Sequence, residues 1–397
     1  METEVVMVYP WHFTDHARCI KNNWFKLKTK WLRQVLCVFS VHFNRISIFT
    51  LYNNCVHLSV ICILINLLHL FVLTRKPLRS SPIYIILTTI AILDIISLSY
   101  DVHMEIAEFY KVMKVCYPKE TDYNILLIKN IMEFIRNYTR RCSTWHSFSI
   151  ALIRTLIIKN PINPKFEILS KPKIAFYVIP TILILCAPIH LMDIYKYEIE
   201  IYDEHYKCTQ YPEYTTYFYG NTVSAMFQKD DNRIQKINRT IDAIISKFIP
   251  CLLFPIVTII LVIEIRKADI QKQRMAKSSN ESKKASIESR NTSRLVLFLT
   301  LPFFMAELPL GIIFMISPMD IFRKAIGFTL FMEGLEKFFS FILSGTTATH
   351  MIVCLFMSAQ YRKIVWSFVR CGYTVTEKKS EMVVQVHSQK MLSARTV

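Results

Sequence analysis

The residues with the clearest chemical potential are charged side chains placed inside long apolar stretches. Arg140 and Arg141 lie in one such stretch with Trp145 one helical turn further on, and Glu307 lies in another. An ionisable group near the centre of a bilayer costs about 2.5–3.5 kcal/mol even on a lenient scale. Each of these groups therefore needs a partner or a water-filled cavity, and the four residues are candidate ligand-binding residues.

The depth of these charges follows from helical rise. With Arg154 at the inner face, Arg140 and Arg141 lie about 20 Å above it at 1.5 Å per residue. Glu307 follows Arg294 by thirteen residues, which again gives about 20 Å. The equal depths predict an ion pair of Glu307 with Arg140 or Arg141. The alternative is that each charge is solvated separately, by snorkelling or by water.

A second polar set is expected at mid-membrane depth. Asp94 lies about twelve residues into the second apolar stretch, Asn66 lies in the first and Ser344 in the last. A carboxylate among polar neighbours could hold a sodium ion or a proton that changes with conformation. The alternative is a neutral, hydrogen-bonded carboxyl group.

Sequence signatures of enzymes and of metal or cofactor sites are missing. Six glycines leave no phosphate-cradling loop. No His-Glu-x-x-His, Gly-x-Ser-x-Gly or Cys-x-x-Cys pattern occurs, and the eleven histidines show no metal-ligand spacing. We therefore expect a protein that is not an enzyme and has no cofactor and no metal.

The elements that must position these residues are seven apolar stretches, in a chain that is 52% hydrophobic with a mean hydropathy of +0.30. Each meets the length of about 20 residues that a helix needs to cross a bilayer. They span 50–73, 82–103, 131–157, 173–194, 243–265, 295–317 and 330–357. The fold expected is an all-α membrane protein, a seven-transmembrane helix bundle with a short interfacial eighth helix. We divide the chain into an extracellular arm (1–48), the membrane domain (49–357), the interfacial helix (358–371) and a cytoplasmic tail (372–397).

The net charge of +18 is attributed to basic residues facing anionic lipid, and nucleic-acid binding is not expected. The loop from Glu264 to Arg294 carries nine basic residues, whereas the loop from Asp193 to Arg239 has eight acids against six bases. This contrast predicts a plasma-membrane protein with its N-terminus outside, although the N-terminal arm is itself basic. Met1–Pro10 lacks a signal-peptide pattern, so the first apolar stretch should direct insertion. Val35–Phe43 is too short to span, and is either an amphipathic lead-in or a sign of a mis-assigned start.

The loops and tail contain candidate covalent sites. Cys116 and Cys208 both lie in predicted outer loops, and a disulfide between them would tie the third helix to the long loop at about 2–4 kcal/mol. Asn238 begins the one glycosylation sequon in a predicted outer loop. Cys371 follows the interfacial helix and is either a lipidation site or an idle thiol. The tyrosine-rich loop from Asp193 to Ile241 could cap a cavity or form an interfacial aromatic belt.

The order and spacing of short motifs over about 50–370 resemble those of the rhodopsin-like G-protein-coupled receptors. Within them the chain is most similar to the nematode serpentine chemoreceptor class W, a group similar to FMRFamide-type peptide receptors. The resemblance rests on Asn66–Leu70 with Leu73–Lys76, Ile90–Asp94, Arg140–Trp145, Ala151–Leu156, Ala306–Pro309 and Met357–Arg362.

The resemblance implies roles for particular residues. Asn66 and Asp94 match the polar anchors of the first two helices, and Arg154 matches the arginine that contacts the G protein. Glu307 stands where many relatives carry a tryptophan, and Ile153 replaces the acid that usually precedes the arginine. The Asn-Pro-x-x-Tyr pattern of the seventh helix is also missing. These departures leave the activity of the receptor without ligand undecided, whereas the expected fold does not depend on them.

The function expected is a chemosensory or neuropeptide-sensing G-protein-coupled receptor. Its partners would be an extracellular ligand, anionic or peptide because of Arg140 and Arg141, a heterotrimeric G protein and membrane lipid. The alternative is a seven-helix ligand-gated chemoreceptor channel of the insect type, with the N-terminus inside. A third possibility is a transporter or scaffold.

Overall fold

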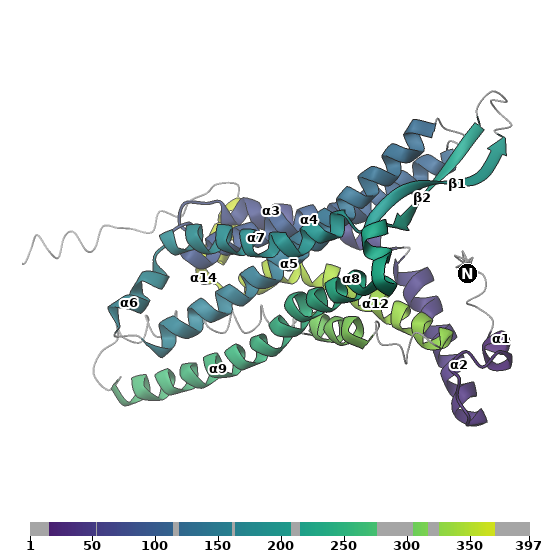
Figure 1. Ribbon diagram of the computed structural model, residues 1–397. Coiled ribbons are helices and arrows are strands. Elements are labelled where there is room, and N and C mark those ends of the chain that lie inside the picture. Colours follow the sequence, from purple (N-terminus) through teal and green to yellow (C-terminus); the bar gives the residue numbers. More distant parts are fainter. Residues whose placement is uncertain are drawn as a thin grey trace, which may run out of the picture.

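A computed structural model describes residues 16–52, 54–113, 119–160, 163–207, 215–275, 305–316 and 325–369. These residues form an elongated helical bundle with one β-hairpin (Figure 1). The hairpin projects from one end of the bundle, and the short helix α6 (Pro164–Glu167) lies at the opposite end (Figure 1). We call these the hairpin end and the basic end.

The bundle helices correspond to the predicted apolar stretches. They are α3 (Cys55–Leu73), α4 (Pro82–Met113), α5 (Lys119–Lys159), α7 (Lys173–Ile194), α9 (Ile249–Met275), the helix Met305–Ile316, α12 (Ile326–Thr346) and α13 (Thr349–Met357). Five segments of the described chain are long and apolar enough to cross a membrane. α5 has 41 residues, about 60 Å at 1.5 Å per residue, but its charges keep it outside that set. The predicted sixth stretch, 295–317, is described only over Met305–Ile316, so its full length lies outside the described residues.

Large apolar side chains cover the outside of the bundle. Ile184 and Leu185 of α7 are 70% and 69% exposed, and Leu64 and Leu68 of α3 are more than half exposed. A water-soluble surface rarely carries contiguous apolar patches of this kind. Lipid tails solvate such side chains, so the exterior supports the prediction of a membrane bundle.

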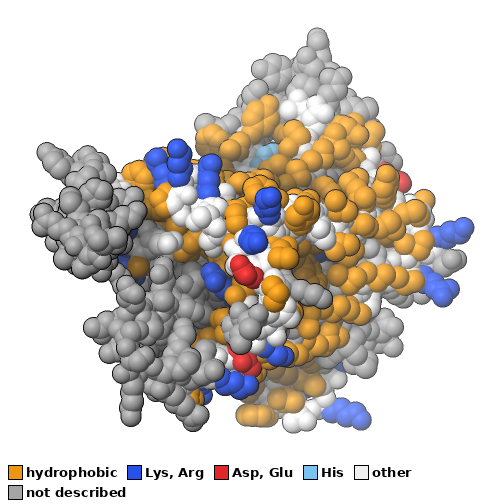
Figure 2. All heavy atoms as spheres, turned by 90° about the vertical axis from the view of Figure 1, so that its left-hand side faces the viewer, with side chains coloured by type: hydrophobic (Ala, Val, Ile, Leu, Met, Phe, Trp, Pro, Cys, Tyr) orange, Lys and Arg blue, Asp and Glu red, His pale blue; other side chains and the backbone are white. Residues whose placement is uncertain are grey.

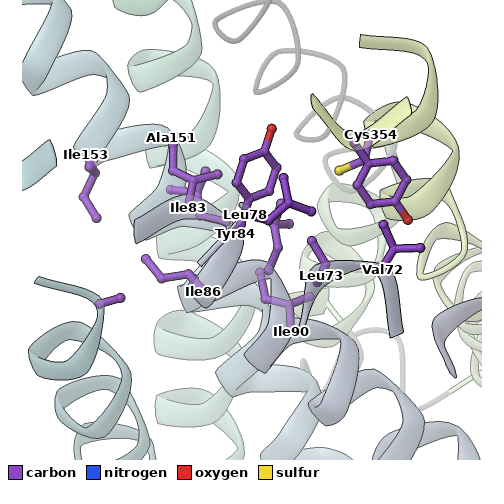
Figure 3. Close-up of a cluster of buried hydrophobic side chains, with 14 of the residues drawn as sticks. Val72, Leu73, Leu78, Ile83, Tyr84, Ile86, Ile90, Ala151, Ile153 and Cys354 are labelled. Atoms are coloured by element: carbon purple, nitrogen blue, oxygen red, sulfur yellow. The ribbon is translucent and has the colours of Figure 1, made fainter. Parts of the chain in front are cut away.

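The largest cluster of buried apolar side chains joins α3, α4, α5 and α13 toward the basic end. Figure 3 shows Ile83, Ile86 and Ile90 of α4 in this cluster, together with Ala151 of α5 and Cys354 of α13. Within lipid, close van der Waals packing rather than the hydrophobic effect holds helices together. This cluster therefore fixes α4 against α5, the two helices that carry most of the buried charges.

The N-terminal arm, which was predicted to be extracellular, contains α1 (His16–Lys21) and α2 (Lys30–Asn44), followed by a π-helical segment (Arg45–Tyr52). A disulfide joins Cys19 to Cys37. The unit packs on the outer part of α12, where the Gly327 N–H donates to the carbonyl of Trp24 at 3.0 Å and the rings of Phe25 and Phe328 lie 5.0 Å apart.

Two glycines of α12 allow this close approach. A Cβ at Gly327 would lie 2.9 Å from the ring of Phe25, and one at Gly334 would collide with the Asn44 side chain. A larger residue at either position would require the side chain of Phe25 or Asn44 to move from its place against α12. The segment Val35–Phe43, interpreted as an amphipathic lead-in or a start-site error, is therefore part of a packed helix.

The hairpin forms from the long loop after α7. β1 (Tyr197–Lys207) pairs antiparallel with β2 (Thr215–Val223), with Tyr197 opposite Val223. It leans on the outer part of α5, where Asn130 and Asn221 exchange side-chain hydrogen bonds of 2.9 and 2.7 Å. The Tyr219 N–H also donates to Asp122 at 3.0 Å. After β2 the chain continues through α8 (Ala225–Asp242) and a second π-helical segment, η4 (Ala243–Phe248), into α9.

The last described helix, α14 (Ala359–Val369), lies at the basic end and within the predicted interfacial helix 358–371. Tyr361 is buried there and hydrogen-bonds His69 of α3 at 2.8 Å. The Arg75 guanidinium lies over the rings of Phe71 and Phe368 at 4.3 and 4.5 Å. Figure 2 shows this end with Lys and Arg side chains spread over an apolar surface and few acidic ones. The exposed bases of this end include Lys76, Arg79, Lys159, Lys171, Lys173, Arg266, Lys267 and Lys363.

Candidate functional site

A cavity of about 760 Å³ lies at the hairpin end, bounded by α5, α7, β1, α8 with η4, the helix Met305–Ile316 and α12. Its volume is within the range of small-molecule and short-peptide sites. Along α5 its lining runs from Tyr123 to Arg141, about 27 Å of helix at 1.5 Å per residue. The cavity is therefore deep and narrow, and its floor lies inside the bundle.

Arg140 forms part of the floor. Its Nε donates to the Ser97 hydroxyl at 3.1 Å, and its Nη2 donates to the Ser344 hydroxyl at 2.9 Å. The carboxylates of Asp101, Glu307 and Asp94 lie close enough to attract its charge. The arginine thus bridges α4 and α12, and Arg136 as well as these acids lies close enough to act on its charge.

Arg141 faces a different part of the bundle. It forms an ion pair with Asp242 of α8, and Asp242 also accepts a hydrogen bond from Ser246 at 2.6 Å. The predicted direct ion pair of Glu307 with Arg140 or Arg141 is not among the contacts of the described residues, in which Thr144 donates to Glu307 at 3.5 Å. Adjacent helical residues point about 100° apart, so two arginines at one depth meet different neighbours.

Arg136, one helical turn nearer the hairpin end than Arg140, forms an ion pair with Asp101. Its Nη1 lies 3.8 Å from Asp101, its guanidinium lies 4.1 Å from the centre of the Tyr100 ring, and Ser59 donates to Asp101 at 2.6 Å. This pair was not predicted from the sequence. The signal was present in the spacing, because Asp101 lies two turns after Asp94 and Arg136 lies one turn before Arg140, on matching helix faces.

The predicted polar set at mid-depth is divided between two neighbourhoods. Ser143 donates to Asp94 at 2.8 Å, and Nε2 of His350 lies 4.0 Å from the other oxygen of Asp94. The Asn66 amide donates to the Cys62 carbonyl at 2.9 Å and contacts Thr347 at 3.5 Å. Ser344 instead accepts the hydrogen bond from Arg140. Within the described ranges no group of three or more His, Cys, Asp or Glu could hold a metal ion.

Comparison with known proteins agrees with this architecture. A model of the family described as "Serpentine type 7TM GPCR chemoreceptor Srw" matches residues 52–372, most of the chain. The chain belongs to this family. It is also 22% identical over 246 residues to the G-protein coupled receptor dmsr-1 of Caenorhabditis elegans, covering 60% of this chain and 47% of that receptor. The chain thus spans about half the length of this curated relative.

In this Srw chain the other two predicted ligand-binding residues lie outside the cavity lining. Trp145 belongs to a packed cluster with Leu93, Cys142 and Cys186, and its ring meets Phe148 edge-on at 5.7 Å. Glu307 is 2% exposed and lies behind the floor of the cavity, outside its lining. Trp145 and Glu307 are therefore placed to support the walls of the cavity rather than to contact a ligand.

Asn238, the predicted glycosylation site, lines the cavity. Its Nδ2, the atom that would carry a glycan, donates to Asp193 at 3.3 Å, and Asp193 also lies 3.0 Å from His190. A glycan would have to displace this contact and fill the cavity, so the geometry disfavours modification here. Lys196, Tyr197 and Ile199 line the same cavity, which favours the interpretation of the tyrosine-rich loop as a cap.

Arg154, predicted to couple to the G protein, lies near the other end of α5. It is fourteen residues from Arg140, about 21 Å along the helix. Its neighbour Ile153 is buried in the core cluster, and within the described chain Arg154 forms no ion pair. The effect of Ile153 in place of an acid on resting activity stays a prediction.

The predicted disulfide and lipidation sites, Cys116, Cys208 and Cys371, lie outside the described residues. Among the described residues a disulfide joins Cys19 to Cys37, and this bond was not predicted. The available signal was that both cysteines fall in the predicted extracellular arm, where oxidising conditions favour pairing.

Proposed function

We propose that this Srw-family chain is a plasma-membrane receptor that binds an extracellular peptide in the cavity and activates a heterotrimeric G protein. The observation that carries the proposal is the course of α5. One continuous helix lines the cavity from Tyr123 to Arg141 at the hairpin end and presents Arg154 near the basic end. A ligand and an intracellular partner would thus act on the same rigid element.

The charge distribution supports the orientation that this function requires. The described bases at the basic end outnumber the acids, and one of those acids, Glu264, is paired with Lys267 at 2.9 Å. Cytoplasmic loops carry the excess of Lys and Arg in membrane proteins. The hairpin, the cavity and the disulfide Cys19–Cys37 would then face the exterior, where disulfides persist.

Activation would follow a population shift. A ligand that binds one arrangement of the helices around the cavity more tightly than another stabilises that arrangement by its differential affinity. The interface of α5 with α9 can respond, because α9 contains Pro255, which removes one backbone hydrogen bond and favours a kink. Movement there would change the surroundings of Arg154.

A peptide fits the dimensions of the site. A cavity of about 760 Å³, lined in part by Tyr197 and Ile199 of β1, offers room for a few residues in extended form and polar groups to orient them. Membership of a receptor family favours this function over a ligand-gated channel of inverted topology.

The test is to express the full chain in cells, apply fractionated neuropeptide libraries, and record G-protein nucleotide exchange together with membrane current. We expect exchange without current, and an N-terminal epitope that antibodies reach without permeabilisation. The variant Arg154→Gln should lose most exchange while ligand binding is unchanged, and the exposed Arg266→Gln at the same end should retain both. Ligand-gated current without exchange, or an epitope reached only after permeabilisation, would refute the proposal.

A further inference from the structure

Helix α2 of the N-terminal unit has one side packed against the protein. Cys37, Val41 and Asn44 on that side are buried. Cys37 is bonded to Cys19 of α1, and the Asn44 side chain lies against Gly334 of α12. Figure 1 shows α1 and α2 beside the outer part of α12, at the hairpin end. These contacts fix the rotation of α2 about its own axis.

The opposite side of α2 is apolar and exposed. Trp31, Val35, Val38 and Phe39 follow one another at helical spacing and fall within about 100° of the helix circumference. Each is between 40% and 69% exposed, and Phe39, at the edge, also contacts the ring of Phe331 at 5.8 Å. We call these four residues the outer face of α2. Contiguous exposed apolar side chains of this kind mark a surface that binds a membrane or a partner.

The outer face is directed to the same side as the lipid-facing surface of α3. Helix α12 packs against α2, the π-helical segment Arg45–Tyr52 and α3, so the sides of these segments that point away from α12 form one surface. On α3 that surface carries Leu64 and Leu68, which are more than half exposed. Ile46, between α2 and α3, is also more than half exposed. The surface that lipid covers along α3 therefore continues through Ile46 to α2.

Basic residues flank the outer face at both ends. The sequence from His16 to Tyr52 contains seven Lys and Arg residues and no acid. Lys26, Lys28 and Lys30 are exposed before and at the start of α2, and Arg45 is exposed just after it. In a helix at the membrane interface, apolar side chains enter the acyl region and bases meet the anionic headgroups. A soluble polyanion would match the bases but would leave the apolar face in water.

We propose that the outer face of α2 is a lipid-binding surface, which enters the leaflet at the hairpin end while the lysines beside it contact phospholipid phosphates. The N-terminal unit is then held between lipid on one side and α12 on the other. Because Ser340 and Leu343 of α12 line the cavity, the unit joins this leaflet to a wall of the cavity. The proposal concerns a surface outside the cavity and requires neither a ligand nor a G protein.

The test is quenching of tryptophan fluorescence by brominated lipid. The purified full chain is placed in nanodiscs that hold one copy each, made of phosphatidylcholine and phosphatidylserine with or without bromine on the acyl chains. The chain has five tryptophans, so the emission of Trp31 is the difference between the wild type and Trp31→Phe. The matched control is Trp24→Phe, because Trp24 lies in the same unit but packs on the cluster of Cys19, Phe25 and Cys37.

Brominated lipid should lower the emission of Trp31 by about twofold or more, as expected for a side chain at the boundary of headgroups and acyl chains. The emission of Trp24 should fall much less. Thermal unfolding checks that both variants fold as the wild type does. Emission of Trp31 that brominated lipid leaves unchanged, or lowers no more than that of Trp24, would overturn the proposal. Since each disc holds one copy, quenching cannot come from a second copy of the chain that displaces lipid.

A second set of variants tests the contact with phosphate. In the triple variant Lys26→Gln, Lys28→Gln, Lys30→Gln, quenching of Trp31 should weaken and should no longer increase with the content of phosphatidylserine. The control Lys229→Gln, an exposed change on α8, should behave as the wild type. A triple variant with unchanged quenching would refute the contact of the lysines with phosphate. Heparin that alters the emission of Trp31 where brominated lipid does not would assign the surface to a polysaccharide and overturn the proposal.

Discussion

Replacing Arg140 by methionine should destabilise the bundle and make its stability depend on sodium. The methionine fills much of the same space but removes the cation that lies among Asp94, Asp101 and Glu307. Those carboxylates would be left with less compensation in a low-dielectric interior. We expect a monovalent metal cation to be drawn into the place of the guanidinium.

The magnitude follows from the contacts of Arg140. The substitution removes two hydrogen bonds, to Ser97 at 3.1 Å and to Ser344 at 2.9 Å. It also leaves Asp94 and Glu307, which are 4% and 2% exposed, without their nearby cation. A hydrogen bond to a charged group is worth about 1.5–3 kcal/mol, so the loss of the two should cost at least about 3 kcal/mol. Sodium at ten times its Kd would return about 1.4 kcal/mol of that loss.

The assay is thermal unfolding of the purified full chain in detergent, in sodium chloride and in choline chloride at equal ionic strength. The wild type should have the same Tm in both salts, whereas Arg140→Met should have a lower Tm that sodium partly restores. Lys229→Met, an exposed change on α8, controls for loss of charge. Adding Glu307→Gln to Arg140→Met should cost less than the sum of the single changes, because the two sites are coupled. An Arg140→Met chain as stable as the wild type, or a wild type equally dependent on sodium, would refute the reasoning.

Three further predictions concern other parts of the chain. The double variant Cys19→Ser, Cys37→Ser should lose about 3 kcal/mol of stability in the N-terminal unit, seen as faster tryptic cleavage there; an unchanged rate would contradict the packed arrangement. Asn238→Gln should leave electrophoretic mobility unchanged, and a mobility shift of the wild type on deglycosylation that the variant lacks would show that this amide leaves the cavity. Tyr361→Phe should lower the Tm by the loss of its hydrogen bond to His69, about 1–3 kcal/mol because the imidazole is left buried; an unchanged Tm would show that this contact contributes nothing.

Helix positions could be predicted well because they depend on local properties. A segment within lipid must satisfy its own backbone hydrogen bonds, so a long apolar run becomes a helix whatever surrounds it. The fourth stretch was predicted at 173–194 and forms α7 over Lys173–Ile194. The first was predicted at 50–73 and forms α3 over Cys55–Leu73. Proline and basic residues mark these ends in the sequence itself.

The partners of the buried charges could not be predicted in the same way. Helical rise gave the depth of Arg140, Arg141 and Glu307, but depth does not give the direction in which a side chain points. That direction matters only relative to neighbouring helices, whose rotation is set by packing. Asp242 became the partner of Arg141 because α8 and a π-helical segment bring it over α5, an arrangement that no local pattern announces.

The sequence by itself determined that the chain is a bundle of membrane helices, where its charges lie in depth and which family motifs it carries. These follow from hydropathy and from the fixed geometry of a helix. The tertiary structure decided which charges neutralise one another, that the long loop forms a hairpin over the cavity, and that the N-terminal arm packs on α12. Such contacts join residues far apart in the chain, so no local pattern of the sequence specifies them.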